Sequence, residues 1–264
     1  MFIHPDFDPV ILHIAGPIAI RWYGLSYLVG FLGAYLLGRS RIIDNIPFSQ
    51  SVFSDLIFYV MLGVILGGRV GYILFYSPML ILHDPVKILY IWQGGMSFHG
   101  GLIGVILAVA YFCHKFKLHF LDVTDFIAPL VPIALCTGRC ANFINAELYG
   151  RVTDVPWAMM FPNVDTSPRH PSQLYEMFAE GILLFTILNY LGSKHFLRGF
   201  NTGMFLLFYS IFRIFLELFR QPDVGLGFIL AGSITMGQLL SVPMFILGCF
   251  FILNARDIDR NYGV

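Results

Sequence analysis

Seven long runs of apolar residues constrain the fold of this chain more than any other feature. They lie near 17–38, 52–76, 97–113, 123–145, 173–191, 203–219 and 234–254. A helix of roughly 20 apolar residues crosses the hydrocarbon core of a bilayer, which is about 30 Å thick. Backbone polar groups find no water there, so the chain must pair them within helices. The runs therefore predict an all-α integral membrane protein with about seven transmembrane helices.

The composition excludes a soluble enzyme, a disordered tail and a nucleic-acid binder. Apolar residues make up 57% of the 264 residues and charged residues only 12%, which is roughly half the charged share of soluble domains. With 16 basic and 16 acidic residues, no net charge attracts a polyanion. We expect one polytopic domain over 1–264, with a small loop region at about 146–172 as its longest connection.

The distribution of Lys and Arg predicts the orientation, because these residues concentrate in cytoplasmic loops. Connections after the first, third and fifth runs, together with the C-terminal tail, hold eight of the 16 basic residues. These eight are Arg39, Arg41, Lys115, Lys117, Lys194, Arg198, Arg256 and Arg260. We therefore expect the N-terminus outside, the C-terminus in the cytoplasm and the 146–172 loop on the outer side.

Polar residues inside the runs are clustered, although each charge in a bilayer costs a few kcal/mol on insertion scales. In the predicted orientation, Arg69, Arg139 and Arg213 fall in the outer halves of their spans. His99 and Tyr23 open inward-running spans at the same surface. Separate segments thus bring polar groups to one depth, which predicts a site near the outer face.

Arg139 and Arg213 are the candidates for binding an anion. With Arg69 they give three cations near this depth, against the carboxylates of Glu147 and Glu217. A surplus cation in a low dielectric requires an anion, and a guanidinium matches the geometry of a phosphate. We predict that both arginines bind a phosphate group. Structural or ion-pair roles are expected for Arg69, Glu217 and Arg220.

Four further residues have two readings each. Asn142 and Asn145 lie near the helix face of Arg139, where they either orient a ligand or form hydrogen bonds between helices. His99 is either a proton acceptor or a hydrogen-bonded residue at the membrane edge. Tyr23 either belongs to the aromatic belt or lines the site.

Glycines and cysteines have architectural explanations. The glycines of the second and third runs favour close packing of two helices; they are Gly63, Gly67, Gly71, Gly100, Gly101 and Gly104. The cysteines form no CxxC motif and are expected to pack as small apolar residues; they are Cys113, Cys136, Cys140 and Cys249. No metal-ligand spacing such as HExxH occurs, so neither a metal site nor a cofactor is expected.

Six stretches, in this order, resemble the prolipoprotein diacylglyceryl transferase family. They are FDPVILHIAGPIAIRWYGLSYLVGF, GGRVGYILFY, GGMSFHGGLIG, GRCANFINAELYGR, RHPSQLYE and FRIFLELFRQPD. The fourth is similar to the family's signature, although Cys140 and Ala141 stand where Gly usually precedes the Asn. The resemblance implies a bacterial inner-membrane enzyme that moves a diacylglyceryl group from phosphatidylglycerol to the lipobox cysteine of a prolipoprotein.

The resemblance also implies roles for individual residues. Arg139 and Arg213 would hold the lipid headgroup, while Asn142, Glu147 and Gly150 complete the signature. The residues expected to contact phosphatidylglycerol are Arg139, Arg213, Asn142, Asn145, Gly150 and Tyr209. The nucleophile would be the cysteine of the substrate peptide, and the lipid phosphate would leave as glycerol phosphate.

A base must take the proton of the substrate thiol, because the thiolate is the reactive form. His99 is the candidate on chemical grounds, with Tyr23 and Glu147 as rivals. The periplasmic depth expected for these residues suits two substrates that lie in or against the outer leaflet.

Two other classes of membrane protein are weighed against this reading. A transporter or flippase of an anionic lipid would also use intramembrane arginines, but its site usually lies near mid-bilayer between inverted repeats, and no repeat is visible. An intramembrane protease would need a Ser–His pair, two aspartates or a metal motif. Asp125 stands alone in its run.

Overall fold

The computed structural model describes residues 2–15, 18–42, 49–90, 95–192, 197–222, 228–230 and 234–257. Lys194 and Arg260, used above to orient the chain, lie outside the described residues. The chain divides into two compact units. The first comprises Met1–Leu12, Ile20–Ala34 and Asp125–Val264, and the second comprises His13–Ala19 and Tyr35–Thr124. Each unit is described by itself below.

Helices occur in all seven ranges expected from the apolar runs. In chain order they are α1 (Trp22–Ser40), α2 (Gln50–Tyr76), α4 (Phe98–Phe116), α5 (Phe120–Ile127) with α6 (Val131–Ile144), α7 (Ser172–Glu176) with η3 (Met177–Leu183) and α8 (Leu184–Leu191), α9 (Phe200–Leu216) and α10 (Met236–Leu253). Within the described residues, four stretches are long and apolar enough to cross a membrane, or five if α5 and α6 form one bent span. The protein is therefore mostly helical and of membrane type.

The described residues are mostly rather than entirely helical, because the connections contain short strands, together with two short helices. Ile18–Arg21 form a strand, and the first helix begins at Trp22 rather than near position 17. The short helices are α3 (Leu80–His83) and η1 (Pro85–Leu89). The strands are β1 (Phe2–Ile3), β2 (Val10–Ala15), β3 (Ile18–Arg21), β4 (Met159–Met160), β5 (Pro168–Arg169), β6 (Leu197–Arg198), β7 (Phe228–Leu230), β8 (Ile234–Thr235) and β9 (Arg256–Asp257).

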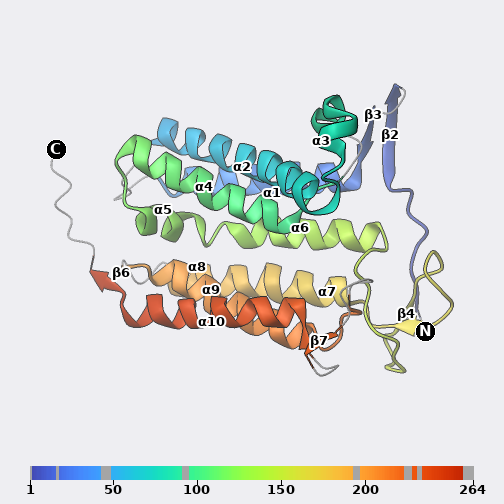
Figure 1. Cartoon of the computed structure of the whole chain (residues 1–264). Coiled ribbons are helices and arrows are strands. Elements are labelled where there is room, and N and C mark those ends of the chain that lie inside the picture. Colours follow the sequence, from blue (N-terminus) through green and yellow to red (C-terminus); the bar gives the residue numbers. More distant parts are fainter. Residues whose placement is uncertain are drawn as a thin grey trace. The chain divides into compact units, whose positions relative to one another are not determined.

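In the first unit, α6, α8, α9 and α10 lie side by side (Figure 1). Leu184 and Leu188 of α8 pack against Met204 of α9 in a buried apolar cluster. α10 begins with a capping box, in which Thr235 and Gln238 exchange side-chain and backbone hydrogen bonds. This packing fixes α9, which carries Arg213, against the helices on either side.

The helix expected over residues 123–145 is interrupted, and two helices, α5 and α6, stand in its place. α5 and α6 meet at an angle of 49° across residues 128–130. Pro129 lies at the break and Pro132 lies in the first turn of α6, where its missing N–H would be unpaired in any case. The break separates α6, which carries Arg139, from the preceding apolar segment.

In the second unit, α2 and α4 are the principal packed pair (Figure 1). A Cβ atom built on Gly63, Gly67 or Gly71 would collide with the backbone of α4 at Gly100 or Gly104. The predicted close packing of these helices through small residues is therefore confirmed. The helix α4 begins at an N-cap, where Ser97 Oγ accepts a hydrogen bond from the Gly100 backbone N–H.

Candidate functional site

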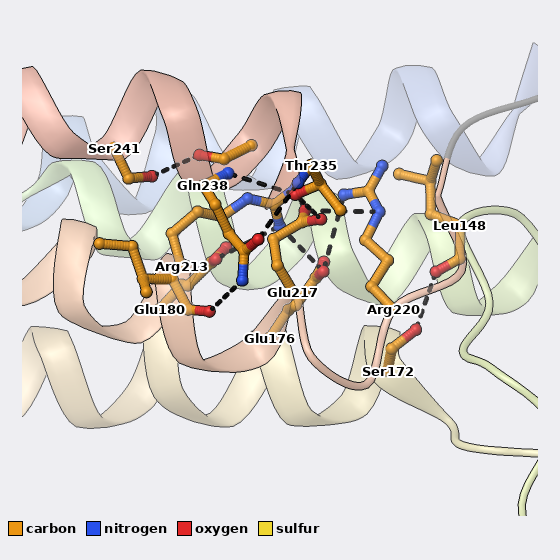
Figure 2. A network of polar contacts seen from close by, with 12 residues as sticks. Leu148, Ser172, Glu176, Glu180, Arg213, Glu217, Arg220, Thr235, Gln238 and Ser241 are labelled. Carbon is orange, nitrogen blue, oxygen red and sulfur yellow. Dashed lines mark hydrogen bonds and ion pairs between the residues drawn. The ribbon is translucent and has the colours of Figure 1, made fainter. Parts of the chain in front are cut away.

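A buried network of ion pairs joins α6, α7, η3 and α9. Arg139 of α6 places Nε 2.9 Å from Glu176 Oε2 and donates from Nε and Nη2 to Glu180 Oε2, at 3.3 and 3.2 Å. Arg213 of α9 donates from Nη1 to Glu176 Oε1 at 2.9 Å and lies 3.5 Å from Glu180 Oε1. Figure 2 shows Arg213 among these glutamates. The two arginines predicted to act together therefore share the same pair of carboxylates.

The network extends along α9 to Glu217 and Arg220. Arg213 Nη2 lies 2.5 Å from Glu217 Oε1, and Thr235 Oγ1 donates to Glu217 Oε2 at 2.8 Å (Figure 2). Arg220 lies 3.6 Å from Glu176 and 3.9 Å from Glu217. Glu217 thus pairs more closely with Arg213 than with Arg220.

Sequence reasoning missed Glu176 and Glu180, which pair with Arg139 and Arg213, so its expectation of a surplus cation is wrong. Among the described residues, the network holds three arginines and three glutamates, so the formal charges of these six groups cancel. A signal was present in the sequence, because two glutamates spaced i, i+4 interrupt an apolar run. The surplus-cation argument for phosphate binding therefore does not hold, and any case for it must rest on the arrangement of the groups.

A π-helical turn places the two glutamates. η3 follows α7 directly, so Glu176 is the last residue of α7 and Glu180 lies in the middle of the π-helix. A Cβ atom built on Gly181 would lie 2.7 Å from Cys136 Cβ, so η3 and α6 approach closely there. π-turns are rare and occur often at functional sites. This close approach brings Arg139, three residues beyond Cys136, onto the carboxylates.

Arg139 is also linked to the exposed carboxylate of Glu147. Asn142 Oδ1 accepts from Arg139 Nη1 at 3.5 Å, and Asn142 Nδ2 donates to Glu147 Oε2 at 3.3 Å. Asn142 is buried and Glu147 is exposed. Asn142 therefore bridges the buried network and the carboxylate that is accessible beside it.

The backbone on both sides of Glu147 has unusual φ angles and is held by hydrogen bonds from α7. Ala146 and Leu148 have φ values of 53° and 55°, a region that non-glycine residues rarely adopt. Gln173 Nε2 donates to the Glu147 carbonyl at 2.6 Å. Ser172 Oγ donates to the Leu148 carbonyl at 2.9 Å (Figure 2). The first turn of α7 thus holds the loop that presents Glu147.

The other predicted residues of the first unit include Asn145, Tyr209 and Tyr23. Asn145 caps the C-terminal end of α6, and its buried Oδ1 has no hydrogen-bond partner among the described residues. Tyr209 lies one turn before Arg213 on α9 and stacks on Phe205. Tyr23 is exposed on α1, edge-on to Tyr27.

Gly150 has no room for a side chain. A Cβ atom there would lie 2.6 Å from His170 Cβ and 2.8 Å from the Phe219 carbonyl oxygen. Arg151 next to it donates to the carbonyls of Glu217 and Arg220 at the end of α9. This glycine therefore lets the loop after α6 close onto the end of the helix that carries Arg213.

Two loop residues outside the membrane-type helices have perturbed pKa values. The hydrogen bond from Arg169, with that from the Ser167 backbone N–H, holds the pKa of the Asp165 carboxyl below its usual 3.8. Burial lowers the pKa of His170 below its usual 6.5. His170 also lies edge-on to Phe219 and accepts from the Gly150 N–H through its carbonyl. Its neutral form is therefore the one that fits the folded loop.

Arg69 and His99 belong to the second unit. Arg69 is buried and donates to the backbone carbonyls of Ile88, Lys87 and Gly95. Its guanidinium thus secures the connection between α2 and α4, in keeping with the structural role expected for it. His99 is exposed in the first turn of α4. Its convergence with the arginines of the first unit stays a prediction.

The arginines of the network are more exposed than Glu176 and Glu180. The side chains of Glu176 and Glu180 are 0% exposed, whereas those of Arg139 and Arg213 are 14% and 12% exposed. An anion that reached this network would meet guanidinium groups before carboxylates. Guanidinium N–H groups form strong, directional hydrogen bonds with phosphate oxygens.

Comparisons with known proteins identify the family. The family description prolipoprotein diacylglyceryl transferase matches residues 9–254. Proteins named phosphatidylglycerol–prolipoprotein diacylglyceryl transferase are similar to this chain over nearly its whole length. The one from Bordetella parapertussis is 53% identical over 264 residues, which is 98% of this chain and 100% of the relative.

Two further relatives carry the same name. The Nitrosomonas europaea protein is 54% identical over 261 residues, covering 98% of this chain and 94% of the relative. The Legionella pneumophila protein of strain Paris is 52% identical over 249 residues, covering 94% and 97%. With a family match that covers the network of Arg139 and Arg213, this chain belongs to the prolipoprotein diacylglyceryl transferase family.

Proposed function

We propose that this protein transfers the diacylglyceryl group of phosphatidylglycerol to the lipobox cysteine of bacterial prolipoproteins. The observation that carries the proposal is the family match over residues 9–254, together with relatives about half identical along the whole chain. The paired arginines supply chemistry that suits a lipid phosphate. No relative described above is named as a transporter, so the flippase alternative receives no support.

The proposed reaction is a substitution at a glycerol carbon. The substrate thiolate attacks the carbon that bears the phosphate ester, and a C–S bond forms as the C–O bond breaks. The electron pair of the C–O bond leaves with glycerol phosphate, and the thiol proton passes to a base. Arg139 and Arg213 stabilise the charge that develops on the departing phosphate, since fixed cations act most strongly where charge appears.

Further roles are assigned by position and chemistry. Asn142 and Asn145 orient the headgroup next to Arg139, and Tyr209 bounds it along α9. Gly150 permits the close approach of the loop. Asn142 also gives Glu147 a fixed position beside Arg139, which makes its exposed carboxylate a rival to His99 and Tyr23 as the base.

The proposed location is the bacterial inner membrane, with seven spans, a periplasmic N-terminus and a cytoplasmic C-terminus. The helices found in all seven expected ranges support this topology. The residues after α6, including β4 and β5, then form the periplasmic loop region. The reacting groups lie towards the periplasm, where the prolipoprotein meets the outer leaflet.

The decisive experiment uses the purified full chain in nanodiscs that contain phosphatidylglycerol. A synthetic lipobox peptide is added, and the peptide mass is followed. A gain of one diacylglyceryl group, with release of glycerol phosphate, supports transfer, and a peptide with its cysteine replaced by serine is the control. Movement of labelled phosphatidylglycerol between leaflets without any change in peptide mass would contradict the proposal and favour a flippase.

A further inference from the structure

We propose that Glu176 and Glu180 are positioning residues that hold Arg139 and Arg213 side by side as one phosphate-binding pair. This inference deepens the proposed function and rests on it. Neither glutamate is expected to touch the lipid, because both side chains are fully buried. Their action on the reaction goes through the two arginines.

Glu176 is the centre of the arrangement. Its Oε2 lies 2.9 Å from Arg139 Nε, its Oε1 accepts from Arg213 Nη1 at 2.9 Å, and the same oxygen lies 3.6 Å from Arg220 Nη1. One carboxylate thus contacts guanidinium groups from two different helices, α6 and α9. Two bare guanidinium groups would repel each other in a low dielectric. A carboxylate between them allows both to occupy the same small region.

Glu180 provides a second bridge one turn further along the helix. It accepts two hydrogen bonds from Arg139 through Oε2, and its Oε1 lies 3.5 Å from Arg213 Nη1. With two carboxylates on two arginines, the distance and the relative orientation of the guanidinium groups are both constrained. Glu217 also holds Arg213, but its printed ion pairs do not include Arg139, so Glu176 and Glu180 are the described carboxylates that link the two guanidinium groups.

A purely stabilising role explains the network poorly. Buried ion pairs can often be replaced by apolar residues of similar volume without loss of stability. The side chains of Glu176 and Glu180 are fully buried, whereas those of Arg139 and Arg213 are partly exposed. Two oxygens, Glu176 Oε2 and Glu180 Oε1, lack the hydrogen-bond geometry despite their ion pairs. Arg139 has five guanidinium N–H groups and forms three side-chain hydrogen bonds among the described residues, one each from Nε, Nη1 and Nη2. The remaining N–H groups of Nη1 and Nη2 are therefore available to an incoming phosphate.

Because the charges of the network balance, removing one carboxylate gives a clear prediction for lipid binding. Glu176→Gln keeps the size of the side chain but removes one negative charge, so the network gains a net positive charge. If the carboxylate only offset charge, phosphatidylglycerol would bind more tightly to this variant. If it positions the arginines, the amide N–H₂ group turns one guanidinium away and binding weakens. The two explanations thus predict opposite signs.

The experiment measures two quantities for the wild-type chain, Glu176→Gln and Glu180→Gln. The first is the KM for phosphatidylglycerol, from initial rates of peptide lipidation in phosphatidylcholine nanodiscs with increasing phosphatidylglycerol content. The second is retention of phosphatidylglycerol by the purified protein, from native mass spectrometry. We expect the KM to rise on the order of tenfold or more, because small misplacements of binding groups have large effects, and we expect retention to fall in parallel.

Two controls separate positioning from general damage. Glu176→Asp keeps the charge and is expected to restore part of the KM. Asp84→Asn removes a carboxylate from an exposed ion pair with Lys87 and should leave the KM unchanged. Should Glu176→Gln not fold, the KM of Glu180→Gln is decisive: a rise supports positioning. An unchanged or lower KM in the folded glutamine variants would overturn the inference.

The design also keeps the two proposals distinguishable. A wild-type chain that retains phosphatidylglycerol but never lipidates the peptide contradicts the proposed function alone. In that case, retention by the two glutamine variants still tests the positioning role. A wild-type chain that lipidates the peptide, with glutamine variants of unchanged KM, contradicts only the positioning role.

Discussion

Replacing Arg139 separates its contribution to stability from its contribution to catalysis. Arg139→Met keeps much of the side-chain length but removes the cation that contacts Glu176 and Glu180. Within the part of the chain that the structure describes, the ion pair left to Glu180 is then the one with Arg213, at 3.5 Å. Removing one partner of a buried ion pair typically costs about 3–5 kcal/mol, so we expect a loss of stability of this size. Loss of one charge-stabilising donor typically lowers kcat by about 10²–10³.

A double variant distinguishes these two effects. Arg139→Met with Glu180→Gln removes one cation and one anion, which leaves two arginines and two glutamates and restores the charge balance. We expect most of the lost stability to return, because an exchanged buried pair is often neutral. Peptide lipidation should stay lower by about 10²–10³, because no guanidinium replaces that of Arg139.

The assay combines peptide mass with thermal unfolding in detergent. The four cysteines are free, and Cys136 is partly shielded where it packs against Gly181, so a thiol-reactive dye reports unfolding. A Cys140→Ala background removes the signal of the exposed cysteine. If lipidation recovers together with stability in the double variant, Arg139 acts only as a structural ion-pair partner and our reasoning is refuted.

Three further predictions concern other parts of the chain. Gly67→Ala should lower stability by about 1–3 kcal/mol, as overpacking does, whereas Gly101→Ala, whose Cβ would meet its nearest neighbour at 3.6 Å, should change the unfolding temperature little. Because burial lowers the pKa of His170, its contribution to stability is complete above pH 6.5 and is lost as the pH falls; hydrogen exchange of the loop should show this loss, and it should vanish in His170→Gln. Replacing all four cysteines by Ala should leave lipidation largely intact, since the substrate supplies the thiol; loss of lipidation in folded protein would instead indicate a covalent enzyme intermediate.

Much of the helical architecture could be predicted from the sequence. Apolar runs, glycine spacing and helix length are local features, and they correctly indicated helices in all seven ranges and the contact between α2 and α4. The site was predicted less completely. The sequence placed Arg139 and Arg213 in one site because both were expected at the same depth in the membrane. In the structure both arginines contact Glu176 and Glu180. The identity of those partners was missed.

The role of Arg69 illustrates the limit of reasoning from depth alone. Sequence reasoning counted it among the cations at one level of the membrane. In the structure its guanidinium donates to three backbone carbonyls in the connection between α2 and α4. Carbonyl acceptors are present in every segment and leave no trace in the sequence, so such a pairing cannot be read from residue types.

By itself, the sequence determined that this chain folds into apolar helices and that two arginines stand within them, because hydrophobicity and charge are properties of each residue. Only the tertiary structure decided which carboxylates those arginines meet. Arg139 and Glu180 are 41 residues apart in the chain, and they meet because a π-helical turn and a glycine bring η3 against α6. Pairing between distant segments depends on packing geometry, which no local pattern encodes.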